Sequence, residues 1–473
     1  MRCRIILAAS VLLILLSACQ ASGESSSGSP SGSAPAEPDV PAVSEPAEPV
    51  EEEPVRYYTP DPEDASRYVL VSSAELGEGV RCWIADPEDE SRYVEVVLTR
   101  PDQSGVYEYV IYKPDLTQER LDAVLAETME NYSASAVSLA AIEDGRVTVS
   151  SAWGWAVKGE REMTADTKVR VASLTKVSLG MCAMAMAEDG LLQLDAPLST
   201  YWGEGVHNPR SEGQPSAYTL MTHTSSLTDQ GYLNGLSNLR ARLQSASSWR
   251  SMEPGNGGYW YYSNFGFCVL GTTLELAADQ VLDTYLQSRY LEPLGIRASI
   301  FPGKLEADEV ACLYNSSGGV DRSTTAQTGQ GVPGEIGQGA SYFPGGLTIS
   351  APDLARLVSI LANDGVCDGV RYLSRESVAD METPRFTVNY DASPFEQCLV
   401  LRRQEDLMGR ASIYYHTGSA YGVYSLLSYD PETGDGVVVI TVGAPRNVND
   451  RGLYALCADL SERLYAEMEG DPS

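Results

Sequence analysis

The stretch A-S-L-T-K at residues 172–176 gives the strongest indication of the fold and the chemistry of this chain. It places the Ser173 hydroxyl and the Lys176 amine three residues apart, at the start of an apolar run that closes at Gly190. Residues with this spacing lie about one turn apart on one helix face. The pattern predicts a helix whose N-terminal end holds a nucleophile beside its proton acceptor. In the alternative interpretation, Ser173 only caps the helix and Lys176 is solvated.

Residues 1–18 have the features of a secretory signal. Arg2 and Arg4 precede a short apolar run over residues 5–16, and small residues lead up to Cys19. The run is too short for a membrane span, which needs about 20 residues. The L-S-A-C ending resembles the lipobox of bacterial lipoproteins and implies lipid attachment at Cys19. We therefore expect a lipid-anchored protein on the extracytoplasmic face of the bacterial cell membrane; a freely secreted protein is the alternative.

Residues 19–55 are predicted to be a disordered acidic tether. The segment is rich in Ser, Pro and Gly, and residues 20–54 contain no aromatic or basic side chain. Such a composition cannot bury enough apolar surface to offset the entropy of ordering, and its like charges keep it extended.

Residues 56–114 are predicted to form a small β module rich in tyrosine. The nonapeptide at residues 61–69 nearly repeats at residues 86–94, and each copy runs from turn residues into alternating β-type sequence. Strand tyrosines of this kind usually pack on one another, although contact with glycan or protein is an alternative.

Residues 115–473 are predicted to form one larger domain of the α+β or α/β class. A helix is expected over 117–131, a β-hairpin over 137–156, three strands over 412–417, 424–429 and 436–442, and a closing helix over 449–468. Strands from both ends of the segment bracket a helical middle. This order predicts a central antiparallel sheet flanked by helices, with a mainly helical lobe inserted.

Composition excludes several kinds of partner. A formal net charge of −32 argues against nucleic acid, which requires clustered Lys and Arg. The 3 histidines lie far apart and no C-x-x-C pair occurs, so no metal site and no cofactor are expected. No disulfide is assigned, and Cys182 and Cys268 lie in apolar runs typical of buried thiols.

Two further motifs follow the Ser–Lys pair. Residues 262–264 read Y-S-N, and residues 416–419 read H-T-G-S on a predicted strand. Each motif has an imitation nearby: Tyr232 begins another Y-x-N in a glycine-flanked loop, and His223 nearly reproduces the H-T-G. We interpret Tyr232 as a loop residue and His223 as a structural histidine.

The order S-x-x-K, Y-x-N, H-T-G resembles the serine β-lactamase and penicillin-binding superfamily, in its class C β-lactamase and D-Ala-D-Ala carboxypeptidase or esterase branch. Residues 220–227, 262–267, 344–348 and 416–422 look like that branch as well. The similarity spans nearly all of residues 115–470. It implies a β-lactamase-like fold and a substrate that is a small D-amino-acid peptide, ester or β-lactam, with peptidoglycan as a further partner.

The resemblance also implies roles for individual residues. Ser173 would attack the substrate carbonyl, Lys176 would be its proton partner and Tyr262 would relay protons. Asn264 would bind the substrate's amide. The remaining residues would bind the substrate, namely His416, Thr417, Gly418 and Ser419. The backbone N–H groups of Ser173 and Ser419 would together form an oxyanion hole. For Tyr262, a packed core tyrosine is the alternative.

One departure from class C enzymes concerns the third motif. They carry K-T-G where this chain has H-T-G, as several carboxypeptidase and esterase members do. Lysine is a permanent cation, whereas we expect His416 to be only partly charged near neutrality.

Two other functions are alternatives to a Ser–Lys hydrolase. A Ser-His-Asp hydrolase would need a G-x-S-x-G turn, and that pentapeptide does not occur in the chain. A catalytically inert, penicillin-binding-like cell-wall sensor or binding protein is the remaining alternative.

Overall fold

The computed structural model describes eight stretches of the chain: residues 57–61, 64–71, 76, 80–86, 89–101, 107–111, 115–389 and 393–468. The predicted signal, the tether and Cys19 lie outside the described residues.

The tyrosine-rich segment contains a five-stranded antiparallel sheet with the strand order β2-β1-β3-β4-β5. Its strands are β1 (Tyr58–Asp61), β2 (Asp64–Leu70), β3 (Arg81–Asp86), β4 (Asp89–Pro101) and β5 (Tyr107–Ile111). The two sequence repeats take equivalent places, because Asp61 pairs with Asp64 in the β1–β2 hairpin and Asp86 with Asp89 in the β3–β4 hairpin.

A nine-stranded antiparallel sheet forms the centre of the larger domain, in the order β15-β16-β17-β18-β19-β20-β6-β7-β8. Its strands are β6 (Ala136–Glu143), β7 (Arg146–Val157), β8 (Arg161–Glu162), β15 (Phe386–Val388), β16 (Phe395–Gln397), β17 (Arg402–Leu407), β18 (Arg410–Ala420), β19 (Val423–Tyr429) and β20 (Gly436–Val442). Strand β20 pairs with β6, so the first and last strands of this sheet in chain order lie side by side.

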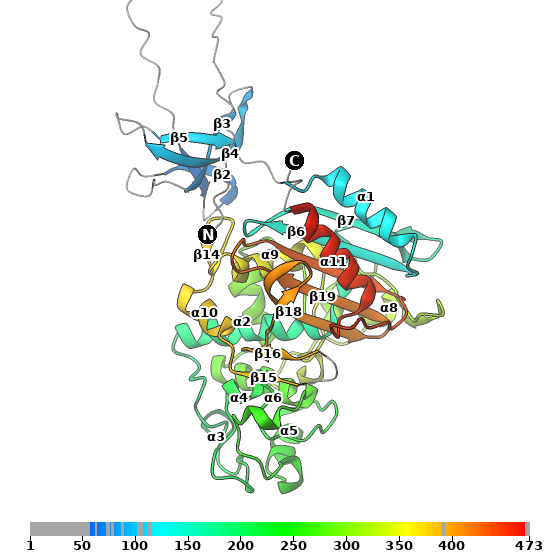
Figure 1. The fold of residues 1–473 in the computed structure, drawn as a ribbon. Coiled ribbons are helices and arrows are strands. Elements are labelled where there is room, and N and C mark those ends of the chain that lie inside the picture. The colour runs from blue at the N-terminus through cyan, green and yellow to red at the C-terminus, as the bar shows by residue number, and fades with distance from the viewer. Residues whose placement is uncertain are drawn as a thin grey trace, which may run out of the picture. The chain divides into compact units, whose positions relative to one another are not determined.

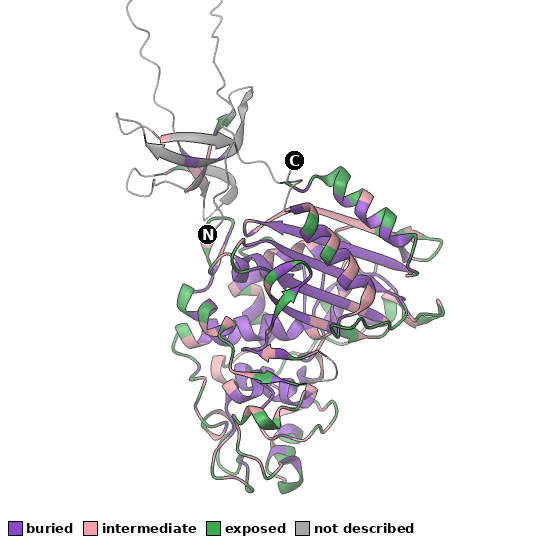
Figure 2. Ribbon diagram, in the orientation of Figure 1, coloured by how far each residue is buried: buried purple, intermediate pink, exposed green. Residues whose placement is uncertain are grey.

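Helices cover both faces of this sheet. On one face lie α1 (Gln118–Met129) and α11 (Ala455–Met468), and on the other lie α9 (Ala351–Ala362) and α2 (Thr175–Glu188) (Figure 1). Strand β6 is buried throughout, with Val137 and Leu139 packed in the cluster under α1 and α11 and with Ala140 in the larger cluster on the other face. Figure 2 shows that the buried residues of the sheet adjoin buried residues of the helices that cover it. Burial on both faces explains why β6 is apolar at consecutive positions.

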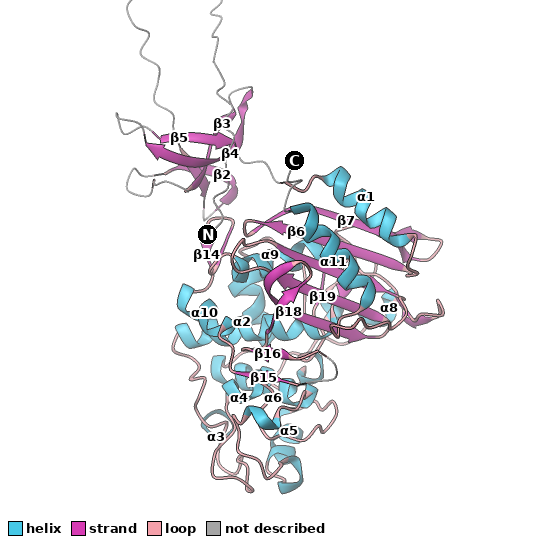
Figure 3. Ribbon diagram, in the orientation of Figure 1, coloured by secondary structure: helices cyan, strands magenta, loops and turns pink. Residues whose placement is uncertain are grey.

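The inserted region between β8 and β15 is mainly helical (Figure 3). Its helices besides α2 and α9 are α3 (Ser199–Trp202), α4 (Ala217–Met221), α5 (Leu236–Leu243), α6 (Asn264–Ala278), α7 (Leu282–Leu286), α8 (Thr324–Thr328) and α10 (Arg375–Glu382). Its short strands are β9 (Val169–Arg170), β10 (Leu313–Tyr314), β11 (Val320–Arg322), β12 (Thr348–Ile349), β13 (Val366–Cys367) and β14 (Val370–Arg371).

In the described part of the chain, no single helix has the length and apolar composition of a membrane span, and only the bent pair 264–278 and 282–291 meets that test by composition. Helix α6, its first half, is a core helix whose side chains are largely buried in the domain.

The predicted elements of the larger domain are present, with one difference in length. The closing helix begins at Ala455 rather than near Asn449. Asn449 instead accepts backbone hydrogen bonds from Arg451 and Leu453 (both 3.0 Å), and Gly452 has a positive φ of 76°. A side chain that binds nearby backbone N–H groups competes with helix formation, which explains the later start.

Candidate active site

Ser173 lies in a strained turn at the entrance of helix α2. The 3-10 turn Ala172–Leu174 leads directly into α2, as the sequence predicted, and Ala172 has a left-handed φ of 52°. The Thr175 hydroxyl donates to Ala172 O (2.7 Å) and accepts from Leu347 N (3.0 Å). These bonds hold the turn in a conformation that alanine rarely adopts, with Ser173 half-buried at a positive helix end.

Lys176 is completely buried and makes three polar contacts. Its Nζ lies 3.0 Å from Ser173 Oγ and donates to Asn264 Oδ1 (3.0 Å) and Pro344 O (2.6 Å). The Pro344 carbonyl and the Asn264 Oδ1 atom can only accept, so they take the two N–H groups of a neutral amine. The lone pair then faces Ser173 Oγ, which is the arrangement a base requires.

Burial lowers the pKa of Lys176, and Arg402 lowers it further, although Tyr262 acts in the opposite direction. Burial by itself would raise the pKa of Tyr262, but nearby Lys176, Ser173 and Arg402 together hold that pKa below its ordinary value. The Lys176 Nζ lies 5.1 Å from the centre of the Tyr262 ring. Lys176 and Tyr262 thus form a coupled pair in which the pKa of each group lies below its ordinary value.

His223 packs against Tyr262 instead of binding solvent. The centres of the two rings are 4.4 Å apart, and His223 Nδ1 accepts from Ser263 N (3.2 Å). Burial lowers the pKa of His223 well below its ordinary value, and Lys176 and His416 add to that effect. A neutral, buried ring in this position supports Tyr262, consistent with the structural interpretation of His223.

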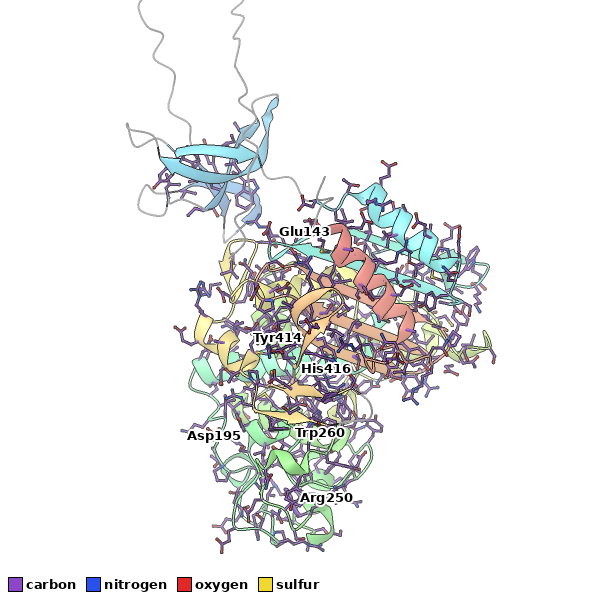
Figure 4. The ribbon with its side chains drawn as sticks, in the orientation of Figure 1. Glu143, Asp195, Arg250, Trp260, Tyr414 and His416 are labelled. Carbon is purple, nitrogen blue, oxygen red and sulfur yellow. The ribbon has the colours of Figure 1, made fainter. Side chains whose placement is uncertain are left out.

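His416 lies on β18, between the central sheet and the helical lobe that holds Trp260 (Figure 4). Its Nδ1 is 2.8 Å from Thr417 O and therefore carries the proton. Burial lowers the pKa of His416 well below its ordinary value, with further contributions from Arg402 and Lys176. The expectation that His416 is partly charged near neutrality was wrong, because the ring is buried and lies near the cationic Arg402.

Arg402 is the permanent cation of this region, and no sequence motif pointed to it. It lies on β17 opposite Tyr415, one position before His416. Its guanidinium carbon lies 4.4 Å from the centre of the Phe395 ring and 6.0 Å from that of Tyr262. Only the pairing of β17 with β18 brings it here, so strand register was the signal that could have found it.

Gly418 allows β18 to approach the nucleophile turn. A Cβ atom at this position would lie 2.5 Å from Val171 O and even closer to Ser425 Oγ. The Ser425 hydroxyl itself donates to Val171 O (2.9 Å) across the same gap. The glycine of the H-T-G motif is therefore required by packing of the strand against residues 171–172.

A pocket of about 490 Å³ opens beside Ser173. Asn264 and Ser419 line it, as does Tyr232, which is 62% exposed. Tyr232 lies in a loop, as the sequence predicted, and the structure adds that this loop forms part of the pocket wall. Of the residues that the sequence predicted for the site, Ser173, Asn264 and Ser419 line this pocket. Lys176 contacts Ser173 and Asn264 from its buried position, and Tyr262 and His416 lie near Lys176.

Comparison with known proteins agrees with this geometry. The beta-lactamase family model matches residues 121–460. This chain belongs to the beta-lactamase family. The matched residues contain the Ser–Lys pair, the Y-S-N segment and the H-T-G strand.

The relatives of this chain include an esterase and a carboxypeptidase/endopeptidase. Esterase EstB of Burkholderia gladioli is 31% identical over 288 residues, which are 52% of this chain and 70% of the esterase. The D-alanyl-D-alanine-carboxypeptidase/endopeptidase AmpH of Escherichia coli K12 is 22% identical over 368 residues, 74% of this chain and 91% of AmpH. The octameric penicillin-binding protein homologue from Pyrococcus abyssi superposes with a TM-score of 0.58 at 23% identity, over 76% of this chain and 78% of that one, which shows the shared fold.

Proposed function

We propose that this β-lactamase-family protein is a serine hydrolase that works through a covalent acyl-enzyme on Ser173. The observation that supports this proposal best is the polar environment of Lys176, whose two acceptor-only partners leave its lone pair for the Ser173 proton. A lysine held only for packing would have no reason to be buried at this spot, since burying a charge is costly.

The proposed reaction begins when Lys176 takes the Ser173 proton and Oγ forms a bond to the substrate carbonyl carbon. Backbone N–H groups of Ser173 and Ser419 would bind the resulting oxyanion. As the bond to the leaving group breaks, Tyr262 gives its phenolic proton to that group and takes the proton that Lys176 holds. Water then attacks the acyl-enzyme with the same groups acting in reverse, which releases the acid and restores Ser173.

Asn264 is suited to bind the substrate's amide. Its Oδ1 is held by Lys176, so its Nδ2 group is directed to other acceptors. We propose D-amino-acid peptides, esters or β-lactams as the substrate class, which the esterase and carboxypeptidase names of the relatives support. Because Arg402 and not His416 supplies the fixed charge, a substrate carboxylate on the leaving-group side would be held by Arg402.

The experiment that tests the mechanism is covalent labelling. We expect a fluorescent penicillin or a fluorophosphonate to label the purified protein, with the mass increase on the peptide that contains Ser173. The Ser173→Ala variant should stay unlabelled while keeping its melting temperature. An unlabelled wild-type protein that nevertheless binds peptidoglycan fragments would favour the inert sensor instead.

We propose further that the protein is lipid-anchored through Cys19 at the extracytoplasmic face of the membrane. The lipobox-like ending of the signal supports this. In cells fed a radioactive fatty acid, the wild-type chain should carry label and sediment with membranes, whereas Cys19→Ser should lose both properties. Equal sedimentation and labelling of the two chains would contradict the anchor.

A further inference from the structure

Two arginines that line the Ser173 pocket both lie close to the ring of one tyrosine. Arg170 and Arg322 have their guanidinium carbons 5.0 Å and 4.3 Å from the centre of the Tyr421 ring. Arg170 Nε donates to Gly345 O (2.6 Å), and Arg322 Nη1 donates to Asp321 O (2.7 Å). A guanidinium has five N–H groups in a planar fork, so most donors of both arginines remain available to the pocket.

The charges of Arg170 and Arg322 are not balanced by acidic partners. Among the described residues, neither arginine has a carboxylate within 4 Å, and the pocket is lined by no Asp or Glu. The carboxylate of neighbouring Asp321 contacts the Asn315 amide instead (3.5 Å). Two like charges thus lie close to one ring with no acidic side chain in the pocket lining, an arrangement that an anionic ligand would stabilise.

The backbone at Tyr421 points to the same site. Tyr421 and Gly422 form the two-residue turn of the β18–β19 hairpin, since Ala420 pairs with Val423. Both turn residues have positive φ, 52° and 75°. Such turns favour Asn-Gly, and a bulky side chain in the first position is uncommon. The strained position places the Tyr421 ring next to both guanidinium groups.

The position of the pocket indicates which part of a substrate it receives. Its lining includes Ser173, Asn264 and Ser419, whereas Tyr262 and Arg402 are not among the described residues that form it. If Tyr262 delivers the proton to the leaving group, the leaving group lies by Tyr262 and the acyl group extends into the pocket. We propose that the pocket binds the acyl part of the substrate and that Arg170 and Arg322 recognise a carboxylate on it.

This inference rests on the proposed hydrolase function for its kinetic test, which uses esters that share a p-nitrophenol leaving group. The half-ester of adipic acid is compared with the hexanoate ester, and the suberic half-ester with the octanoate, with the Ser173→Ala protein as the blank. In at least one of the two pairs, we expect kcat/KM to be at least about 10-fold higher for the anionic half-ester than for the neutral ester, because a guanidinium–carboxylate bond is charge-assisted. The 6-aminohexanoate ester should be the poorest substrate.

The matched variants are Arg322→Gln and Arg322→Lys. The first should lower the ratio of anionic to neutral kcat/KM about 10-fold while leaving hexanoate hydrolysis unchanged, and the second should retain most of the ratio. Arg170→Gln should also lower the ratio, but it removes the bond to Gly345 O and so is expected to slow both esters. A ratio near one in the wild-type protein, or an Arg322→Gln ratio equal to that of wild type, would overturn the inference while leaving hydrolysis intact.

Binding to the Ser173→Ala protein separates this inference from the proposed function. Adipic acid monoamide should bind this variant measurably more tightly than hexanamide in calorimetry, and addition of Arg322→Gln should remove the difference. If neither ester is hydrolysed but this difference is found, the hydrolase proposal fails and the anion site stands. Equal binding of the two amides would reject the anion site whatever the esters show.

Discussion

Replacing Lys176 with methionine is expected to slow acylation of Ser173 by about 10³-fold, within the range that loss of a general base usually causes. Methionine fills a similar volume without a charge, so the buried helix α2 should remain folded. The measurement is the rate of fluorophosphonate or penicillin labelling in excess reagent. The exposed Lys158 provides the matched control, and Lys158→Met should keep the wild-type rate.

The pH dependence gives an independent readout of the Lys176→Met change. The pKa of Lys176 is lower in the folded protein than its ordinary value. In the pH interval between the folded pKa and the ordinary pKa, the unfolded chain therefore binds up to one proton more than the native chain. The wild-type free energy of unfolding should therefore rise with pH across that interval relative to the variant's. Wild-type acylation should increase as the pH rises through the lowered pKa of Lys176, because the neutral amine of the folded protein forms there. Normal labelling of Lys176→Met, or parallel stability curves, would contradict a base role for Lys176.

The placement of the Ser–Lys pair could be predicted from sequence because it depends on local geometry. Spacing of three residues fixes Ser173 and Lys176 on one helix face whatever the rest of the chain does, and Gly190 ends the apolar run where α2 stops. The alternation of apolar residues likewise located β18, β19 and β20 to within about two residues at nearly every end.

The charge state of the site could not be predicted in the same way. The low proton affinity of His416 depends on burial and on Arg402, which lies on a different strand. Tyr232 and Arg322 enter the pocket from loops and short strands that carry no periodic signal. A motif search weighs residues one segment at a time, whereas the electrostatics of a site depend on segments that only the fold brings together.

Replacing Gly418 with alanine is expected to reduce kcat/KM by about 100-fold, because it separates two segments of the site. The added Cβ would lie 2.5 Å from Val171 O and would also collide with Ser425 Oγ, so β18 must move away from the turn that carries Ser173. In the proposed mechanism the oxyanion donors come from these two segments, and a displacement of about 1 Å can cost about 100-fold in rate.

The same Gly418→Ala change should cost about 1–3 kcal/mol in the free energy of unfolding, as overpacking of a tight interior does. Gly334→Ala is the matched control, because a Cβ there meets no atom within 4 Å and the residue does not have a positive φ. That control should match wild type in ester hydrolysis and in urea denaturation. The loss of stability and the loss of activity of Gly418→Ala can be separated by measuring ester hydrolysis at urea concentrations well below the unfolding midpoint of the variant. A variant that is folded but slow under those conditions shows that the strand has shifted. If folded Gly418→Ala keeps the wild-type kcat/KM, close approach of β18 to residues 171–173 is not what activates the serine, and the catalytic arrangement proposed for Ser173 and Ser419 would have to be abandoned.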